Sequence, residues 1–553
     1  MDSKTKRNIT LAIAGICLIA FYPVFTSDFI NYDDPEYVLN NHYIRSFSFE
    51  NIKYIFLGRT TDLYVPLTVF SYMIEYSMFG ENAKVFHGVN LILHIINAVL
   101  LLNILIRLNL KYIYLLGITL VFFAISPLVT ESVCWITERK DVLYCLFYFL
   151  AILQFLHYIQ TKHLKYLVVC LVFFVLACLS KPMAISLPVL LSLYLIYTNT
   201  KEKNLFSQFK AQLPLLPFYG ISLVSAVITT YSLSSLGTVT ANIKNYNVIE
   251  KTGLVISELG YYFTKPFFPF HQQLFHLFPE KQVLFSSENI LLFLVIGLVV
   301  MGSIAYHFFM KKNKLIGFLF LAWLVFLLPV LQIYSNTHSY VSERYFYVSI
   351  IFPVIIVFLL LQSLNIKKTF YQFSLIILIV VFTVFTFKRS AVWKNSKTLF
   401  EDELKKDPKN PLVLNNLGYY YNSKSEFMKA EPLLKAAAEI DSDNASYLTN
   451  YGWALAATKQ TDSAIVYLQK AIDINPNYGE ALNNIGICYM QKHEPEKAAD
   501  YFKKAYAAEP DNKDVLFNLG LYYFQSNQKE KGFPLLKKAY ELGNKKALKY
   551  LNR

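Results

Sequence analysis

Two different patterns of apolar and polar positions meet near residue 390. Before that point, long apolar stretches alternate with short polar loops. A membrane-spanning helix needs about 20 apolar residues. About eleven stretches are candidates by this measure, namely 8–25, 86–106, 112–130, 141–159, 165–180, 183–198, 213–234, 289–310, 315–334, 345–364 and 370–387. The pattern predicts an all-α chain whose residues 1–390 form a polytopic membrane body.

The remainder of the chain is a repeat array. Small residues recur every 34 positions over 407–542, in the columns Gly418, Gly452, Gly486, Gly520 and Ala437, Ala471, Ala505, Ala539. A period of 34 residues with small residues at helix–helix contacts is typical of tetratricopeptide repeats. We expect four two-helix units over 407–542, which form a soluble α-solenoid. Residues 391–406 are predicted to be a connecting helix and 543–553 a C-terminal cap.

The stretch 248–268 decides the topology. It holds four charged residues between Glu250 and Lys265, and each is costly in hydrocarbon. If the stretch does not span, the lysines at 311–314 and 367–368 fall on the cytoplasmic side, as positively charged loops usually do. Loop charge therefore favours a re-entrant or interfacial helix. With a basic, cytoplasmic N-terminus, the repeats then lie on the non-cytoplasmic face.

Composition supports the membrane reading and excludes others. The chain is 55% hydrophobic and only 16% charged, too apolar for a soluble protein with one buried core. Its net charge of +14 lies mostly in loops before residue 390, where it sets topology, so a nucleic-acid surface is not expected. The six cysteines show neither paired nor metal-ligand spacing.

Two adjacent carboxylates follow the first apolar stretch. Asp33 and Asp34 lie in the first outer loop, before Pro35. Such a pair can share a proton, bind a divalent cation or act as a general base. The alternative is an Asx turn that starts a short helix. Neither choice is settled by the dipeptide, so a metal requirement stays open.

Basic residues gather near the same predicted membrane surface. Arg139 and Lys140 lie in the second outer loop, and Lys181 and Arg344 occupy similar positions at two further helix ends. Arginine forks match phosphate oxygens well, which predicts a donor-phosphate site. The alternative is a set of salt bridges with Glu138 or Asp141. The supporting acids in this region are Glu131, Asp141 and Glu343.

An asparagine column runs through the repeats at the same period, at Asn416, Asn450, Asn484 and Asn518. A side-chain amide both donates and accepts hydrogen bonds. A ladder of amides therefore suits an extended acceptor peptide. The alternative is that these residues hydrogen-bond neighbouring repeats to one another.

The order of these motifs resembles the transmembrane O-mannosyltransferases with tetratricopeptide repeats, and their bacterial relatives, in the GT-C glycosyltransferase superfamily. The matching pieces are Asp33-Asp34, Pro66-Leu67, Phe86-His87 with Asn90 and Leu93-His94, Pro127 with Glu131, Arg139 with Asp141, Ser180-Lys181, Glu343-Arg344 and Trp393. The resemblance implies a polyprenyl-phosphate sugar donor, a protein hydroxyl acceptor and base catalysis by the first-loop acids. Val65, Val129 and Pro182 depart from the pattern, so the donor sugar is left open.

The sequence thus predicts a membrane glycosyltransferase that uses a lipid-linked sugar and presents a protein acceptor on its repeats. A non-catalytic repeat scaffold and a lipid-linked glycan ligase or transporter are the alternatives. Short loops favour a bacterial inner membrane with periplasmic repeats over an endoplasmic reticulum membrane with lumenal repeats.

Overall fold

The computed structural model describes residues 3–58, 61, 63–107, 117–198, 205–234, 246–278, 288–309, 314–331, 339–361 and 367–551. These residues are helical apart from turns, loops and one isolated bridge between Leu277 and Ser339. The chain divides into two compact units. The apolar unit comprises Met1–Phe29 and Glu36–Lys394, and the repeat unit comprises Ile30–Pro35 and Asn395–Arg553.

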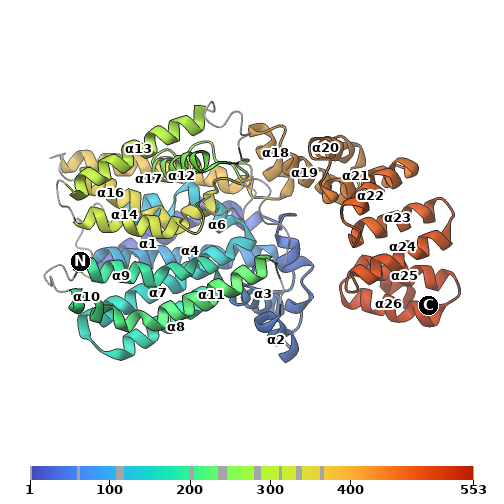
Figure 1. Ribbon diagram of the computed structural model, residues 1–553, viewed down its shortest axis with the longest axis horizontal. Helices are drawn as coiled ribbons and strands as arrows, with labels where there is room; N and C mark the ends of the chain where they lie inside the picture. The colour runs from blue at the N-terminus through green and yellow to red at the C-terminus, as the bar shows by residue number, and fades with distance from the viewer. Residues whose placement is uncertain are drawn as a thin grey trace. The chain divides into compact units, whose positions relative to one another are not determined.

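The apolar unit is a bundle of helices of very different lengths (Figure 1). Its longer helices are α1 (Ser3–Ala20), α2 (Phe49–Leu57), α3 (Pro66–Phe79), α4 (Ala83–Ile106), α7 (Arg139–Thr161), α8 (Leu164–Ser180), α9 (Leu187–Thr198), α10 (Leu205–Gln212), α11 (Leu216–Ser234), α12 (Val248–Thr264), α13 (Glu288–Phe309), α14 (Lys314–Leu327), α16 (Ile351–Leu361) and α17 (Lys368–Val392). Short segments break the bundle near its polar residues. They are η2 (Pro35–Leu39), η4 (Gly117–Ala124), α6 (Thr130–Cys134), η6 (Ile136–Glu138), η7 (Pro182–Ser186), η10 (Glu343–Tyr345) and α15 (Phe346–Ser349).

Helix α4 shows why this unit suits a membrane. Four polar side chains share one face at helical spacing and are all fully buried, namely His87, Asn90, His94 and Asn97. The opposite face carries exposed Ile92 and Ile96. Exposed apolar side chains also cover α11, α13 and α17. A surface with so much contiguous apolar area is unusual for a water-soluble monomer and is compatible with a lipid-facing one.

The described helices meet the criteria for membrane spans less often than predicted. Four are long and apolar enough, namely Ala83–Ile106, Ile136–Thr161, Gln208–Ser232 and Thr369–Val392, and two bent pairs raise the number to six. Helix α1 begins with three basic residues, which shorten its apolar part. Other predicted stretches form shorter apolar helices of 10–17 residues. The expected eleven spans are therefore not confirmed, although the described parts of these stretches are largely helical as predicted. Residues 112–116, 310, 332–334 and 362–364 of these stretches lie outside the described part of the chain.

The ambiguous stretch 248–268 forms α12, which an Asn247–Glu250 capping box starts. Helix α12 packs closely against α13. A Cβ atom added to Gly260 would lie only 1.9 Å from the carbonyl oxygen of Phe293, so glycine is required for this close approach. Of the lysine loops used to infer topology, residues 310–313 lie outside the described part of the chain.

The repeat unit contains the predicted helix pairs. They are α19 (Pro411–Ser423) with α20 (Phe427–Ile440), α21 (Ala445–Ala457) with α22 (Thr461–Ile474), α23 (Gly479–Gln491) with α24 (Pro495–Ala508), and α25 (Lys513–Gln525) with α26 (Lys529–Glu541). Helix α18 (Ser396–Lys406) precedes them, and η11 (Lys545–Ala547) with α27 (Leu548–Leu551) packs on α26. The glycine column follows from helix packing, because a Cβ atom at Gly452 would lie 2.6 Å from Leu468 Cγ.

Residues Ile30–Pro35 belong to the repeat unit although they precede most of the apolar unit in sequence. The backbone N–H of Asn31 donates to Ser396 Oγ (2.9 Å), and Asn31 Nδ2 donates to the carbonyl oxygen of Asn416 (3.0 Å). The segment that contains the acidic pair is therefore hydrogen-bonded to α18 and α19.

Candidate functional site

A cluster of buried charges lies within the apolar unit. We call the following six residues the charge cluster: Glu131, Glu138, Asp141, Lys140, Lys181 and Arg344. Glu138 is central, because its carboxylate lies 3.3 Å from Lys140 Nζ, 3.5 Å from Lys181 Nζ and 3.6 Å from Arg344 Nη1. Lys181 Nζ also pairs with Asp141, whose other oxygen accepts from Ser132 Oγ at 2.9 Å. Five of these six residues are site residues predicted from sequence, supporting acids included, whereas Glu138 enters the prediction only as an alternative salt-bridge partner.

Breaks between helices bring these residues together. Glu138 ends η6, and Lys140 and Asp141 lie in the first turn of α7. Lys181 follows the end of α8 and precedes Pro182, which cannot continue the helix hydrogen bonding. Arg344 lies in η10, before α15. The cluster therefore forms where chain segments end, and long apolar helices run away from it.

The three cations differ in accessibility. Lys140 and Lys181 are 5% and 6% exposed, whereas the Arg344 side chain is 25% exposed. The ion pairs of Arg344 with Glu131 at 3.7 Å and with Glu138 at 3.6 Å are longer than a hydrogen bond. Lys140 Nζ also lies 5.1 Å from the centre of the Tyr37 ring. Arg344 is therefore the cation of the cluster best able to turn toward an anionic ligand.

Arg139 is not part of this accessible surface. Its guanidinium is fully buried and donates to Glu75, to Asn90 Oδ1 and, at 2.9 Å, to the carbonyl oxygen of Phe86. It also stacks 5.1 Å from the Tyr72 ring centre. The sequence placed Arg139 at an exposed phosphate site, but the structure commits its donors to buried partners. The ion pair with Asp141 or Glu138 that was the alternative is replaced by one with Glu75.

Glu75 is a buried charged residue that the sequence did not predict as part of a site. It is the one acidic residue in the otherwise apolar helix α3, and that isolation was the available signal. Burial raises the pKa of Glu75, and the guanidinium of Arg139 lowers it without cancelling the effect of burial. The carboxylate is thus held in place at a net electrostatic cost, as is common for buried ion pairs.

The two acidic residues of the first loop, Asp33 and Asp34, differ in burial. Asp34 is fully buried and its Oδ2 accepts from the backbone N–H of Ile30 at 2.8 Å. This local hydrogen bond fits the turn alternative for Asp34. Asp33 is only partly buried, so it is the better candidate for a base that meets substrate. Both residues belong to the repeat unit.

The remaining predicted acid, Glu343, is 1% exposed and its Oε1 accepts from the backbone N–H of Gln273 at 3.1 Å. Among the described residues, no group of three or more His, Cys, Asp or Glu side chains could hold a metal ion. The open question of a divalent cation is therefore not advanced by the structure.

The asparagine column joins neighbouring repeats and also lines a groove of the array. Asn450 Nδ2 donates to Asn415 Oδ1, and Asn518 Nδ2 donates to Asn483 Oδ1, each at 2.9 Å. These bonds join successive repeats. Asn450, Asn484 and Asn518 also line a groove of about 330 Å³. Asn416 instead accepts from Asn31 through its backbone carbonyl, and it does not line the groove.

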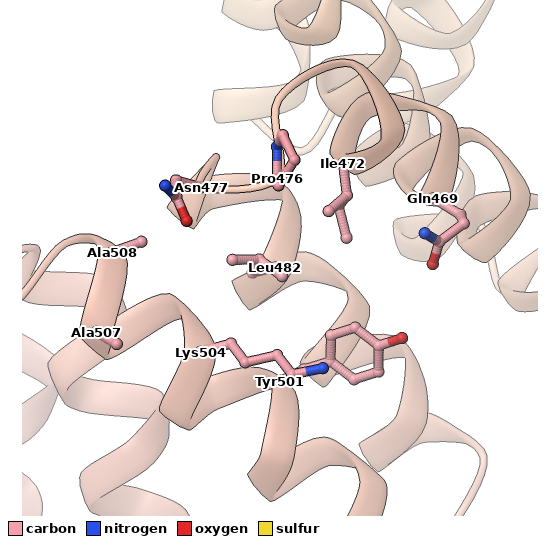
Figure 2. A pocket seen from close by; sticks show the side chains of 9 residues that line it. All are labelled: Gln469, Ile472, Pro476, Asn477, Leu482, Tyr501, Lys504, Ala507 and Ala508. Carbon is pink, nitrogen blue, oxygen red and sulfur yellow. The ribbon is translucent and has the colours of Figure 1, made fainter.

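A second hollow of about 590 Å³ lies between α22 and α24. Figure 2 shows Leu482 beside the opening, with Lys504 and the Tyr501 ring on the α24 side. Tyr501 stacks on Tyr489 with ring centres 5.5 Å apart, and Lys504 Nζ lies 5.1 Å from the Tyr501 ring centre. Both contacts are internal to the array, so the hollow offers fewer unused polar groups than the asparagine-lined groove.

Known families match the repeat unit. Residues 445–478 and 479–512 each match a tetratricopeptide repeat family model. Tetratricopeptide repeats are protein-binding modules, so this part of the chain has a protein-binding role. Among solved structures, similarity is found to MamA (26% identity, 29% of this chain and 94% of that chain, TM-score 0.24) and to a thermophilic repeat protein of Thermus thermophilus, TTC0263 (19% identity, 32% of this chain and 93% of that chain, TM-score 0.27).

Curated relatives point to a transferase over a short region. The chain is 37% identical over 92 residues to the mouse protein O-mannosyl-transferase TMTC1 and 36% identical over 92 residues to the human one. Each match covers 17% of this chain and 10% of the relative. The chain is therefore an all-helical protein with apolar helices compatible with a membrane, tetratricopeptide repeats, and partial similarity to a curated glycosyltransferase.

Proposed function

We propose that this protein is a GT-C-type membrane glycosyltransferase that moves a sugar from a polyprenyl-phosphate donor to a hydroxyl group of a protein acceptor. The observation that carries the proposal is the charge cluster, which places three cations at helix ends of an apolar unit and leaves Arg344 partly exposed. The repeats and the short similarity to O-mannosyl-transferases support the same assignment.

Donor binding is assigned to the apolar unit. A phosphate ester is anionic, and Arg344 can exchange its two long ion pairs for charge-assisted hydrogen bonds to phosphate oxygens. Lys140 and Lys181 add positive potential, and Glu138 holds all three cations together. Glu131 and Asp141 support Arg344 and Lys181 in the same way.

The same helices also provide apolar lining for a lipid tail. A wholly apolar cavity of about 90 Å³ is lined by residues of α7, α9 and α16, among them Phe149, Leu190 and Ile351. These residues follow Lys140, Lys181 and Arg344 by seven to nine positions. Within α7, the nine positions from Lys140 to Phe149 correspond to about 14 Å at 1.5 Å per helical residue. A phosphate near the cations and an isoprenoid chain along these helices fit that arrangement.

Acceptor binding and deprotonation are assigned to the repeat unit. As the acceptor oxygen attacks the sugar carbon, the bond from that carbon to the phosphate oxygen breaks and the hydroxyl proton must leave. Asp33 is the proposed general base, and Asp34 orients the turn that presents it. The bonds from Asn31 to Ser396 and Asn416 attach this turn to the helices that start the array.

Transfer activity tests the proposal directly. The purified full-length chain in lipid nanodiscs is incubated with radiolabelled polyprenyl-phosphate hexoses and a secreted protein, and labelled protein is counted. Arg344→Gln should raise the donor KM by about 10–100-fold, since hydrogen bonds to charged groups contribute about 1.5–3 kcal/mol. Arg45→Gln is the matched control, because Arg45 is also partly exposed and pairs with Glu81 at 3.6 Å. Equal donor KM values for the two variants would remove the phosphate assignment. An absence of transfer from every donor would leave the scaffold function.

We further propose that the repeats face the non-cytoplasmic side, in a bacterial periplasm or, as the alternative, in an endoplasmic reticulum lumen. The argument is the loop charge. A cysteine introduced at an exposed position of residues 441–474 should react with an impermeant thiol reagent in intact cells or spheroplasts. Labelling only after lysis would place the repeats in the cytoplasm.

A further inference from the structure

The groove of the repeat unit combines aromatic rings with carboxylates. First helices of all four repeats, α19, α21, α23 and α25, line it, and it also receives Lys546 from η11. Tyr419 and Trp453 form its aromatic wall, with ring centres 5.7 Å apart. Glu480 and Asp514 are its acidic residues. We propose that this groove selects an extended acceptor segment that carries a lysine or arginine side chain, which binds between the Tyr419–Trp453 wall and Glu480.

The pairing of acids in the array supports this choice. Six acidic side chains of the array outside the groove pair with lysines, in Glu426–Lys429, Glu439–Lys435, Asp462–Lys492, Glu494–Lys497, Asp500–Lys503 and Asp511–Lys538. Glu480 receives only a hydrogen bond from Tyr478 Oη at 3.4 Å, and no lysine or arginine in the described part of the chain pairs with it. The groove thus retains an unneutralised carboxylate where a ligand would lie.

Electrostatics in the groove favour an added cation. The side chain of Glu480 is exposed to solvent inside the groove, yet the surrounding walls remove enough water to raise its pKa. The carboxylates of Glu509 and Asp514 raise it further. Asp514 already accepts from Asn544 Nδ2 at 2.9 Å. A bound cation would relieve the repulsion among these acids.

The aromatic wall and the amide ladder supply the remaining contacts. An ammonium or guanidinium group binds favourably over the face of Trp or Tyr, and more strongly when the pair is desolvated. Asn484, in the middle of the ladder, makes no side-chain hydrogen bond within the described residues, so its amide is open to a peptide backbone. Lys546 would repel a second cation at its end of the groove, which fixes where the cationic side chain binds.

This inference extends the acceptor-binding part of the proposed function, and its test needs no sugar transfer. Fluorescence anisotropy measures binding of labelled, otherwise uncharged peptides to the full-length chain. The peptides are identical except for one central position, which is lysine, norleucine or glutamate. The lysine peptide should bind about 10-fold or more tightly than the norleucine peptide, and the glutamate peptide most weakly.

Variants show which residues produce the preference for the lysine peptide. Glu480→Gln and Trp453→Leu should each weaken the lysine peptide by about 10-fold while leaving the norleucine peptide within about 2-fold for Glu480→Gln. Glu496→Gln is the matched control, since Glu496 is an exposed acid of α24 outside the groove. Circular dichroism at 222 nm checks that the variants are folded.

The same experiment has a pH dependence. The titratable and charged groups that face Glu480 are Tyr478, Glu509, Asp514 and Lys546. Because the pKa of Glu480 is raised, its charge is lost as the pH falls through mildly acidic values, so binding of the lysine peptide should weaken there before a normal glutamate would protonate. The affinity for the norleucine peptide should not change over the same pH range. Equal affinity for lysine and norleucine, or equal effects of Glu480→Gln and Glu496→Gln, would overturn the inference and would leave the transferase assignment to its own assay.

Discussion

Substitutions in the buried ion pair of Glu75 and Arg139 distinguish most clearly between a structural and a catalytic role for Arg139. Glu75→Gln keeps the size of the side chain and one acceptor for the guanidinium but leaves the charge of Arg139 buried without a counter-ion. Breaking a buried ion pair in this way costs about 3–5 kcal/mol. Since a factor of ten corresponds to about 1.4 kcal/mol, the unfolding equilibrium should shift by roughly 100- to 4,000-fold.

The raised pKa of Glu75 adds a second expectation. Burial penalises this carboxylate by more than Arg139 returns, so the pair is expected to contribute little net stability. The double variant Glu75→Leu with Arg139→Met should therefore be close to wild type, within about 1 kcal/mol, because apolar replacement of a whole buried pair is often neutral. The control is Glu81→Gln, whose partner Arg45 is partly exposed, and an exposed pair contributes about 0–1 kcal/mol.

The cysteines provide the assay. All six are free and buried, so a pulse of thiol reagent during urea unfolding labels only opened molecules. Mass spectrometry then reports each site separately. Cys134 and Cys145 flank Arg139 in sequence and read the apolar unit, whereas Cys488 reads the repeat unit. If Glu75→Gln opens Cys134 no earlier than Glu81→Gln does, and Arg139→Met instead raises the donor KM, Arg139 binds phosphate and the structural assignment is wrong.

Further predictions concern the acidic turn and the repeats. Asp33→Asn should lower the transfer rate by about 10²–10⁴-fold, the usual loss for a general base, with unchanged thiol labelling; full activity would move the base elsewhere. Asp34→Asn should instead lead to earlier thiol labelling of Cys488 during urea unfolding if the hydrogen bond between Asp34 and Ile30 holds the turn on the array. A lower transfer rate with unchanged labelling of Cys488 would contradict that role. Gly452→Ala should destabilise the repeat unit by up to about 2 kcal/mol, because overpacking costs about 1–3 kcal/mol against up to about 1 kcal/mol gained in helix propensity. Gly220→Ala is its control in α11, where no atom lies within 4 Å of the added Cβ, and equal stability changes in the two variants would refute the packing argument.

Periodic features of the fold were predictable from sequence. The 34-residue columns predicted the repeat helices, because in every unit the glycine packs against a large apolar side chain of the second helix, which is leucine in three units and Phe502 opposite Gly486. Apolar runs gave the helices of the apolar unit. Their number as membrane spans was harder, because short breaks such as η4 and η10 bend helices within an apolar run that looks continuous.

The charged residues of the site could largely be predicted from sequence, but the ion pairs that they form with one another could not. Glu131, Asp141, Lys140, Lys181 and Arg344 could be chosen as charges beside apolar runs, whereas the central place of Glu138 could not. Which cation stays accessible depends on contacts between distant segments, and Arg139 is buried by Glu75, which lies 64 positions away. No local pattern reports such a pairing.

The hydrogen bond between Asn31 and Asn416 affects where the chain can be truncated or joined to another repeat array. A protein cut before residue 395 would lose Ser396 and Asn416, and with them two hydrogen bonds that hold the six-residue segment containing Asp33. Loss of activity in such a truncation would be ambiguous, because it removes the acceptor platform and weakens the attachment of the proposed base together. A chimera that exchanges the array must keep Ser396 and α19 in register with Asn31, and the exchange point belongs after α19 instead of at the apparent domain border.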